Sequence, residues 1–183
     1  GGAGAGPDYD GTHAIHTHMT NTLATDPEIL EWRFPVVLES FSIRNNSGGS
    51  GKYRGGNGII RRLRFEEEMT AGVVSGHRRV APFGVDGGEP GKCGRNYIER
   101  ADGTVTELGG TDGAEMSPGD VFVIETPGGG GFGVLAGLGA GAEDRRQPLL
   151  EADMKFAICN ETYRGVGFED VCVDVASCGF DAI

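Results

Sequence analysis

Glycine constrains this chain more than any other residue, because it is abundant and gathers in runs that follow strand-like segments. The sequence holds 34 glycines in 183 residues, well above the usual content of about 7%. In GDVFVIETPGGGGFG (residues 119–133), alternating apolar residues lead directly into four consecutive glycines. No Gly-X-Y period accompanies them, which excludes collagen. We therefore expect tight turns, bulges and close backbone contacts.

Segments with strand-like alternation separate the glycine-rich stretches. Apolar and polar residues alternate along them, which is typical of half-buried strands. Asp102-Gly103 predicts the tight turn of a hairpin, and Pro118-Gly119 predicts a second turn. The predicted strands are residues 36–43, 59–65, 69–76, the two arms of the hairpin at 96–108, and 121–124.

One short helix is predicted before the first strand. Asp26 suits the N-cap, Pro27 suits the first helical position, and Pro35 ends the helix. The order of elements indicates the fold class. We expect an α+β, β-rich fold of short strands joined by glycine-rich turns, rather than a parallel βαβ sheet.

The first predicted strand, residues 36–43, has mixed apolar and polar residues on both faces, so we expect each face to be partly buried. Glu39 lies within it and Arg44 directly follows it. For these two charged residues we favour a structural ion pair or a turn anchor over a catalytic role.

The pattern changes after residue 133. Residues 1–133 form the β-rich part, and residues 134–153 are predicted to be a linker of small and charged residues. Residues 154–183 then begin a β-α-β pattern, with a strand at 155–159 and a helix at 168–178. We interpret this last part as a truncated β-α-β stub, the first step of a parallel α/β fold.

Charge and composition exclude several classes of partner. The net charge of −11 argues against a general nucleic-acid or anionic-membrane surface. No apolar run approaches the roughly 18–20 residues that span a bilayer. No secretory signal is visible and no C-x-x-C pair occurs, so we expect reduced thiols and a cytoplasmic location. The cysteines are Cys93, Cys159, Cys172 and Cys178.

Three strings carry a resemblance to a known family, in the family's order. They are HTHMTNTLATDPEILEWRFPVVLESFSIRNNSGGSGKYRGGNGIIRRLRF, RRVAPFGVDGGEPG and PGDVFVIETPGGGGFG. Over about residues 11–133 the chain resembles the C-terminal region of the hydantoinase B/5-oxoprolinase family. The form HMTNTLATDPEILE is more similar to the 5-oxoprolinases than to hydantoinase B subunits in general.

The resemblance implies part of an ATP-dependent enzyme that opens the lactam of 5-oxo-L-proline to give L-glutamate. It implies a hydantoinase A-type half and the rest of the B-type half as partners, without which this chain is expected to be inactive. ATP and a divalent metal would be bound mainly outside this chain, and the complete enzyme is expected to be an oligomer with a small lactam substrate. The alternatives are a hydantoinase B-type hydrolase subunit, similar to N-methylhydantoinase, and a non-catalytic β-rich interface module.

The family motifs also contain the candidate substrate-binding residues. His18 and Asn21 lie in HMTNT, and Arg54 in YRGGNG is a candidate carboxylate clamp. The glycine run adds Gly128, Gly129 and Gly130. No catalytic residue is identified, because no nucleophile is accompanied by a base.

The glycine run at residues 128–131 has two interpretations. In the structural one, the glycines adopt positive φ angles and pack tightly against another segment or subunit. In the functional one, their free N–H groups form an anion nest beside the substrate carboxylate or a phosphorylated intermediate. No Lys-Ser/Thr follows the run, so it is not a P-loop.

Two further features complete the sequence. The H-x-x-H-x-H pattern of His13, His16 and His18 permits metal binding in a strand, but no carboxylate pattern accompanies it and we predict no metal site. Residues 154–183 resemble the first strand and helix of sugar phosphate isomerases/epimerases of the xylose-isomerase-like TIM-barrel type. Two truncated families that meet at Asp153 and Met154 suggest a fragmentary or fused reading frame.

Overall fold

The computed structural model describes residues 1–16 and 24–135, which lie in the first of two compact units of the chain, Gly1–Leu138. All but the first two residues of the predicted linker at 134–153, and the whole βα unit at 154–183, fall outside the described residues.

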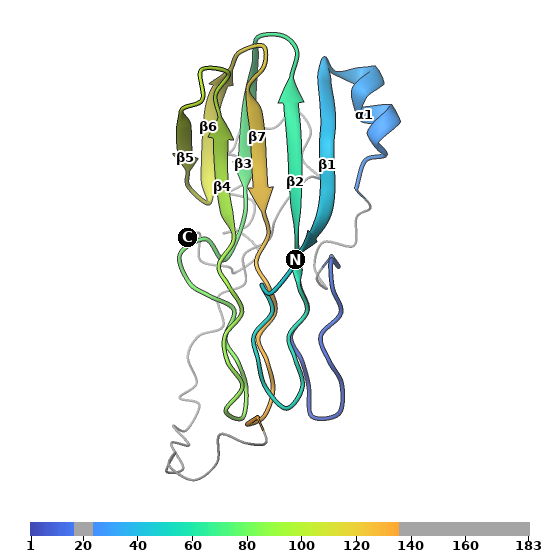
Figure 1. The fold of residues 1–183 in the computed structure, drawn as a ribbon, viewed down its shortest axis with the longest axis vertical. Helices are drawn as coiled ribbons and strands as arrows, with labels where there is room; N and C mark the ends of the chain where they lie inside the picture. The colour runs from blue at the N-terminus through green and yellow to red at the C-terminus, as the bar shows by residue number, and fades with distance from the viewer. Residues whose placement is uncertain (17–23, 136–183) are drawn as a thin grey trace, which may run out of the picture. The chain divides into compact units, whose positions relative to one another are not determined.

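The described region is β-rich, which confirms the expected fold class. Five antiparallel strands form one sheet in the order β1-β2-β7-β4-β5, and β3 pairs with β6 in a second sheet (Figure 1). One short helix, α1, lies beside β1 at the edge of the larger sheet. The bounds are α1 Pro27–Arg33, β1 Val36–Arg44, β2 Gly58–Phe65, β3 Met69–Val74, β4 Arg95–Glu99, β5 Val105–Leu108, β6 Thr111–Met116 and β7 Val121–Glu125.

Helix α1 begins as its sequence predicts. The side chain of Asp26 accepts a hydrogen bond of 2.9 Å from the backbone N–H of Glu28, and Pro27 occupies the first helical position. Phe34 is extended, as the residue before Pro35 must be. The local capping chemistry therefore fixes both ends of the helix.

The predicted turns are also confirmed. Gly103, with φ of 86°, lets the chain reverse between β4 and β5, and Gly119, with φ of 90°, makes the turn before β7. Strand β6 was not predicted, because TDGAEM carries few β-branched or aromatic residues. It forms through its antiparallel pairing with β3, from Met69 opposite Met116 to Val74 opposite Thr111.

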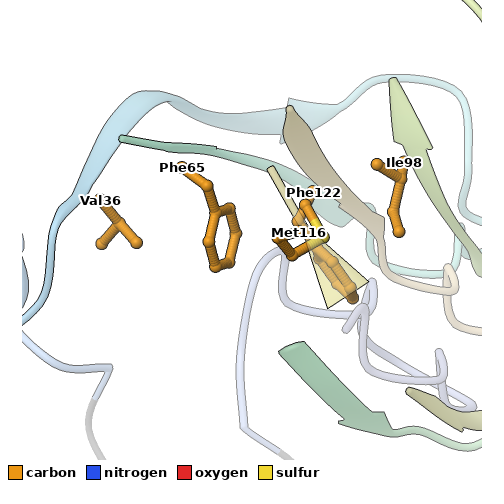
Figure 2. Packing of buried hydrophobic residues seen from close by; sticks show 5 residues of the cluster. All are labelled: Val36, Phe65, Ile98, Met116 and Phe122. Carbon is orange, nitrogen blue, oxygen red and sulfur yellow. The ribbon is translucent and has the colours of Figure 1, made fainter. Parts of the chain in front are cut away.

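The hydrophobic core lies where the two sheets meet. Its buried members come from β1, β2, β4 and β7 of the larger sheet and from β6 of the smaller one. Partly buried residues, including some of β3 and α1, pack around them. Ile98 and Phe122 are directly paired across β4 and β7, so they share one face of the larger sheet. The cluster shown in Figure 2 consists of Val36, Phe65, Ile98, Met116 and Phe122.

The opposite face of the larger sheet is covered by ion pairs. Arg62 contacts Glu99 at 2.7 Å and Glu39 at 3.4 Å. Hydrogen bonds from Arg62 lower the pKa of Glu99, although partial burial opposes the shift. Val121 and Val123 are nonetheless buried on this face, since the long side chains lie over them. Glu39 therefore forms an ion pair, as predicted, and Arg62 is a partner.

One buried amide ties loops to the larger sheet. Asn96 on β4 is fully buried, and its Oδ1 accepts hydrogen bonds of 3.2 and 2.8 Å from the guanidinium of Arg78. Its Nδ2 donates to the Ser75 hydroxyl and to the carbonyl of Gly109, both at 2.9 Å. Because every polar atom of the amide has a partner, its burial carries little desolvation cost.

Candidate functional site: the glycine bundle and its junction with the sheet

The glycine-rich segments run side by side beyond the ends of the larger sheet's strands (Figure 1). We call this part the glycine bundle and define it as residues 1–15, 46–57, 82–94 and 126–133. Backbone hydrogen bonds join the segments, for example from Gly49 N to Gly129 O at 2.8 Å and from Val85 N to Gly131 O at 2.9 Å. The bundle contains isolated bridges but none of the strands named above.

The run at residues 128–131 lies at the centre of the bundle. A Cβ atom on Gly128 would overlap the carbonyl of Ser47, one on Gly129 that of Ala3, and one on Gly130 that of Phe83. A Cβ on Gly131 would overlap the carbonyl of Ser50. Gly131 therefore faces the same segment as Gly128, three residues before it. Successive residues thus face three different neighbours, a three-residue repeat as in a polyproline II helix.

This packing corrects one half of the structural interpretation and confirms the other. The described glycines with positive φ are Gly87, Gly103, Gly119 and Gly133, so the run at 128–131 does not adopt positive φ angles. Its close packing against other segments is confirmed. The residues are glycine because neighbouring backbones occupy the space that a side chain would need.

Most N–H groups of the run are already used within the bundle. Gly128 donates to the carbonyl of Lys92 at 3.1 Å, Gly129 to Gly56 at 2.9 Å, and Gly131 to Glu89 at 2.9 Å. An anion nest requires N–H groups that point at a ligand. These three donors are therefore committed to holding the bundle together.

Arg44 anchors the junction between the sheet and the glycine bundle. Its Nη1 donates to the carbonyls of Cys93 at 2.7 Å and Thr126 at 3.2 Å, and its Nη2 lies 2.8 Å from a carboxylate oxygen of Glu125. One guanidinium thus joins the end of β1 to the end of β7 and to the segment before β4. The turn-anchor prediction for Arg44 is confirmed.

Ser47 continues the junction from Arg44 into the bundle. Its side chain is fully buried, and its hydroxyl donates to the carbonyl of Arg44 at 2.7 Å and accepts from Gly58 N at 2.8 Å. The backbone N–H of Ser47 donates to Oδ1 of Asn57 at 3.1 Å. The hydroxyl fixes the geometry with which β1 and β2 enter the glycine bundle.

Asn57 holds the segment that leads toward the HMTNT motif. Its backbone N–H donates to Nδ1 of His13 at 2.8 Å, and its carbonyl accepts from Ala14 N at 2.9 Å. Because Nδ1 accepts this bond, the ring proton of a neutral His13 lies on Nε2. Ala14 has a φ of 52°, which is an unusual conformation for alanine. The two hydrogen bonds of Asn57, with His13 and with Ala14 itself, support this conformation.

The structure describes only some of the candidate substrate-binding residues. His18 and Asn21 lie outside the described residues. Arg54 is exposed, and its backbone is fixed by a hydrogen bond from its N–H to Asp10 Oδ1 at 2.6 Å. Its neighbour Gly55 packs against Gly129, so the structure brings the YRGGNG motif and the glycine run together.

The described residues do not provide a metal site. Across 1–16 and 24–135, no group of three or more His, Cys, Asp or Glu side chains is placed so that it could hold a metal ion. His13 uses its Nδ1 within the junction, as described above. The divalent metal that the family resemblance implies does not fit the residues described here.

Sequence reasoning missed Asn57 and Ser47 as framework residues. Both are short polar residues directly beside a pair of glycines, in RNNSGG and RGGNG. That position was the available signal, since a short polar side chain can supply a hydrogen-bond partner to nearby backbone. Distant partners, such as His13, which lies 44 residues from Asn57, gave no signal.

Comparison with known proteins identifies one matching family and several similar sequences. The sequence model described as hydantoinase B/oxoprolinase matches residues 1–135. An uncharacterized protein of Schizosaccharomyces pombe is 49% identical over 140 residues, which cover 74% of this chain and 11% of that protein. 5-Oxoprolinase 1 of Arabidopsis thaliana is 44% identical over 133 residues, which cover 73% of this chain and 10% of that protein.

A solved structure shares the fold. The crystal structure of the ATP-dependent caprolactamase from Pseudomonas jessenii matches with a TM-score of 0.59 and 25% identity, over 73% of this chain and 24% of that chain. The present chain thus spans about a tenth of the length of the curated relatives that it matches. The family match ends at residue 135, and the resemblance of residues 154–183 to sugar phosphate isomerases is not borne out.

Proposed function

Because this chain belongs to the hydantoinase B/oxoprolinase family, we propose that it is part of an ATP-dependent 5-oxoprolinase. That enzyme opens the lactam of 5-oxo-L-proline to give L-glutamate. The observation that carries the proposal is the 44% identity to 5-oxoprolinase 1 of Arabidopsis thaliana over 133 residues. The fold shared with an ATP-dependent caprolactamase supports the same class of reaction, the hydrolysis of a cyclic amide.

Within such an enzyme, we assign the described residues a framework role. Neighbouring backbones leave no space for a side chain at the glycines of residues 128–131, and the junction around Arg44 fixes the bundle to the sheet. The chain carries no P-loop motif, and its described residues offer no metal cluster. ATP and a divalent metal would therefore bind mainly to the A-type half and to the rest of the B-type half, and this chain alone is inactive.

The described region also offers one group suited to the substrate. 5-Oxo-L-proline carries a carboxylate, and a guanidinium recognises a carboxylate through two parallel hydrogen bonds. Arg54 is exposed on a segment whose backbone is fixed by Asp10 and by the contact of Gly55 with Gly129. We assign Arg54 to the substrate carboxylate, with His18 and Asn21 as further candidate contacts.

Reconstitution tests the proposal. The 183-residue chain is added to Arabidopsis 5-oxoprolinase 1 that lacks its matching 133-residue segment, and glutamate release from 5-oxoproline and ATP is measured. Restored, ATP-dependent release is the expected result, with neither component active alone. Glutamate release by this chain alone would contradict its role as an inactive part.

A matched control separates specific from unspecific rescue. The same truncated enzyme receives the segment excised from the Arabidopsis protein itself. If the authentic segment restores glutamate release and this chain does not, the assignment to 5-oxoprolinase is wrong.

The second candidate function is a hydantoinase B-type subunit, which the family description equally covers. Hydrolysis of a hydantoin, rather than of 5-oxoproline, by the reconstituted enzyme would favour it. A non-catalytic interface module remains the third candidate, and binding without any hydrolysis of either substrate would favour that one.

The location of the enzyme is part of the same proposal. Among the described residues no helix is long and apolar enough to cross a membrane. We assign the complete enzyme to the cytoplasm, where ATP is available to it, and expect it to be an oligomer.

A further inference from the structure

Asn57 and Gly58 form the only Asn-Gly pair of the sequence. Asparagine is a thermolabile residue, and a following glycine has no Cβ to hinder attack by its backbone nitrogen. In that reaction the Gly58 nitrogen loses its proton and bonds to Cγ of Asn57, while the bond from Cγ to Nδ2 breaks and ammonia leaves. Water then opens the succinimide ring and leaves aspartate or isoaspartate at position 57.

The surroundings of the pair require both of its residues. A Cβ on Gly58 would overlap the carbonyl of Thr126, so a larger residue does not fit there. Asn57 supplies its Oδ1 to two backbone N–H groups, that of Ser47 at 3.1 Å and that of Gly48 at 3.0 Å. The junction between the sheet and the glycine bundle therefore contains a reactive pair for structural reasons.

The peptide between Asn57 and Gly58 is held at both of its polar atoms. The Gly58 nitrogen donates to Ser47 Oγ at 2.8 Å in a buried position. The Asn57 carbonyl accepts from the backbone N–H of Ala14 at 2.9 Å. Ring closure requires this peptide to rotate until its nitrogen approaches Cγ in an attack geometry. Both hydrogen bonds oppose that rotation.

A second pair of the same kind, Asn46 and Ser47, is tied to the first. Asn46 is exposed and has a φ of 59°. The nitrogen that would attack its carboxamide is that of Ser47, and this nitrogen donates to Asn57 Oδ1 at 3.1 Å. Each pair thus holds the attacking nitrogen of the other, one through a hydroxyl and one through a carboxamide oxygen.

We propose that Asn57 is a site of spontaneous deamidation that the folded junction keeps unreactive, with the Ser47 hydroxyl withholding the Gly58 nitrogen. Ser47 acts as a positioning residue. Its side chain is fully buried and its hydroxyl also donates to the Arg44 carbonyl at 2.7 Å, so its orientation is fixed. Opening of the junction frees the pair to react. This role is independent of the reaction that the complete enzyme catalyses.

The two products differ in how well they fit the junction. Aspartate at position 57 keeps an oxygen that can accept from the N–H groups of Ser47 and Gly48. Isoaspartate instead inserts a methylene group into the backbone before Gly58. Ala14 and Ser47 then cannot both keep their hydrogen bonds to the same peptide. Formation of isoaspartate is therefore expected to loosen the junction.

The folded and the unfolded chain are compared first, because this measurement needs no variant. The 183-residue chain is incubated in slightly alkaline buffer, alone and in urea that unfolds it. Peptide mapping by mass spectrometry follows the loss of Asn57 and the appearance of aspartate and isoaspartate. Because only opened molecules react, we expect loss of Asn57 to be at least about tenfold slower in the folded chain. Equal rates overturn the proposal.

Two serine substitutions separate Ser47 from the fold in general. Ser47→Ala removes the acceptor that holds the attacking nitrogen, and we expect the rate at Asn57 to rise by about two- to tenfold. Ser75→Ala is the matched control, because the Ser75 hydroxyl also accepts one hydrogen bond, from Asn96, and donates one to a backbone carbonyl. It is expected to leave the rate at Asn57 unchanged. Equal acceleration by both variants would assign the effect to general loosening and overturn the role of Ser47.

Two further variants keep the test decisive if Ser47→Ala does not fold, and circular dichroism establishes whether each variant folds. Ser47→Cys keeps the size of the side chain but offers a weaker acceptor, so it should also accelerate the loss of Asn57. A rate equal to that of the unsubstituted chain contradicts the role of the hydroxyl. Asn57→Ala removes the acceptor of the Ser47 N–H and should accelerate deamidation of Asn46. An unchanged rate at Asn46 contradicts the mutual protection of the two pairs.

Discussion

The carboxylate of Asp120, only 2% exposed, accepts a hydrogen bond of 2.8 Å from the guanidinium of Arg100. It also accepts backbone hydrogen bonds of 2.9 Å from Ala101 and Ser117. Asp120 precedes β7 and these partners come from the loops at that end of the sheet. The pair therefore closes the end of the sheet that lies away from the glycine bundle.

Asp120→Asn is expected to destabilise the protein at neutral pH. An uncharged amide loses the charge-assisted bond to Arg100 and cannot accept both backbone bonds with the same oxygens. We expect a loss of about 1.5–3 kcal/mol in the free energy of unfolding. Urea denaturation at pH 7 measures it, with Asp102→Asn in the exposed hairpin turn as the matched control. Equal midpoints for the two variants would contradict the structural role of Asp120.

The contribution of Asp120 depends on pH with a defined sign. Burial alone would raise the pKa of Asp120, but hydrogen bonds from Ser117, Ala101 and Arg100 outweigh burial and lower it. The stabilisation is therefore present above the unfolded aspartate pKa of about 3.9 and is lost as the pH falls through the folded pKa. The difference in unfolding free energy between the protein and Asp120→Asn should shrink below about pH 4. A difference that grows on acidification would reverse this assignment.

The glycine bundle predicts an unusual intolerance of alanine. Gly129→Ala places a Cβ against the backbone of Ala3, so the two backbone segments must shift apart. We expect a loss of about 1–3 kcal/mol or more, typical of overpacking. Gly76→Ala is the control, because no atom lies within 4 Å of its added Cβ. Thermal melting compares the two, and a Gly129→Ala variant as stable as Gly76→Ala would refute the close packing.

The strands and the helix could be predicted from local chemistry, whereas the bundle could not. Alternation identified β2 and β7, and Asp26 with Pro27 identified α1, because these signals lie within a few residues of each other. A run of glycines carries no side-chain period that distinguishes helix from strand. Its three-residue repeat is defined only by the segments around it, which come from distant parts of the sequence.

The candidate site shows the same division. The glycine run and YRGGNG could be found by their motifs, and the structure does place them side by side. Arg44 could be identified only as a structural anchor, since its partners Cys93 and Thr126 lie 49 and 82 residues further along the chain. Long-range hydrogen bonds of this kind leave no pattern in a single sequence.

Arg44→Lys tests the junction itself. A lysine keeps the charge beside Glu125 but cannot also reach the two carbonyls that one guanidinium contacts. We expect a loss of about 1.5–3 kcal/mol in unfolding free energy. Arg95→Lys serves as the control, because the ion pair of Arg95 with Glu107 is about half exposed and contributes about 0–1 kcal/mol. Losses of equal size would show that Arg44 is an ordinary surface arginine.

Arg54 is expected to act on the substrate rather than on stability. Its side chain is exposed, and its backbone makes hydrogen bonds with Asp10 and Gly11, so Arg54→Ala should leave the melting temperature of the chain nearly unchanged. In the reconstituted enzyme the loss of a guanidinium–carboxylate contact should lower kcat/KM for 5-oxoproline by about 10- to 100-fold.

Two variants make this last result specific. Lys52→Ala removes an exposed cation two residues away on the same segment and should leave kcat/KM unchanged. Arg54→Lys should recover only part of the activity, because an ammonium group cannot make two parallel bonds to a carboxylate. If Arg54→Ala and Lys52→Ala give the same kcat/KM, Arg54 does not bind the substrate and the carboxylate is recognised elsewhere in the enzyme.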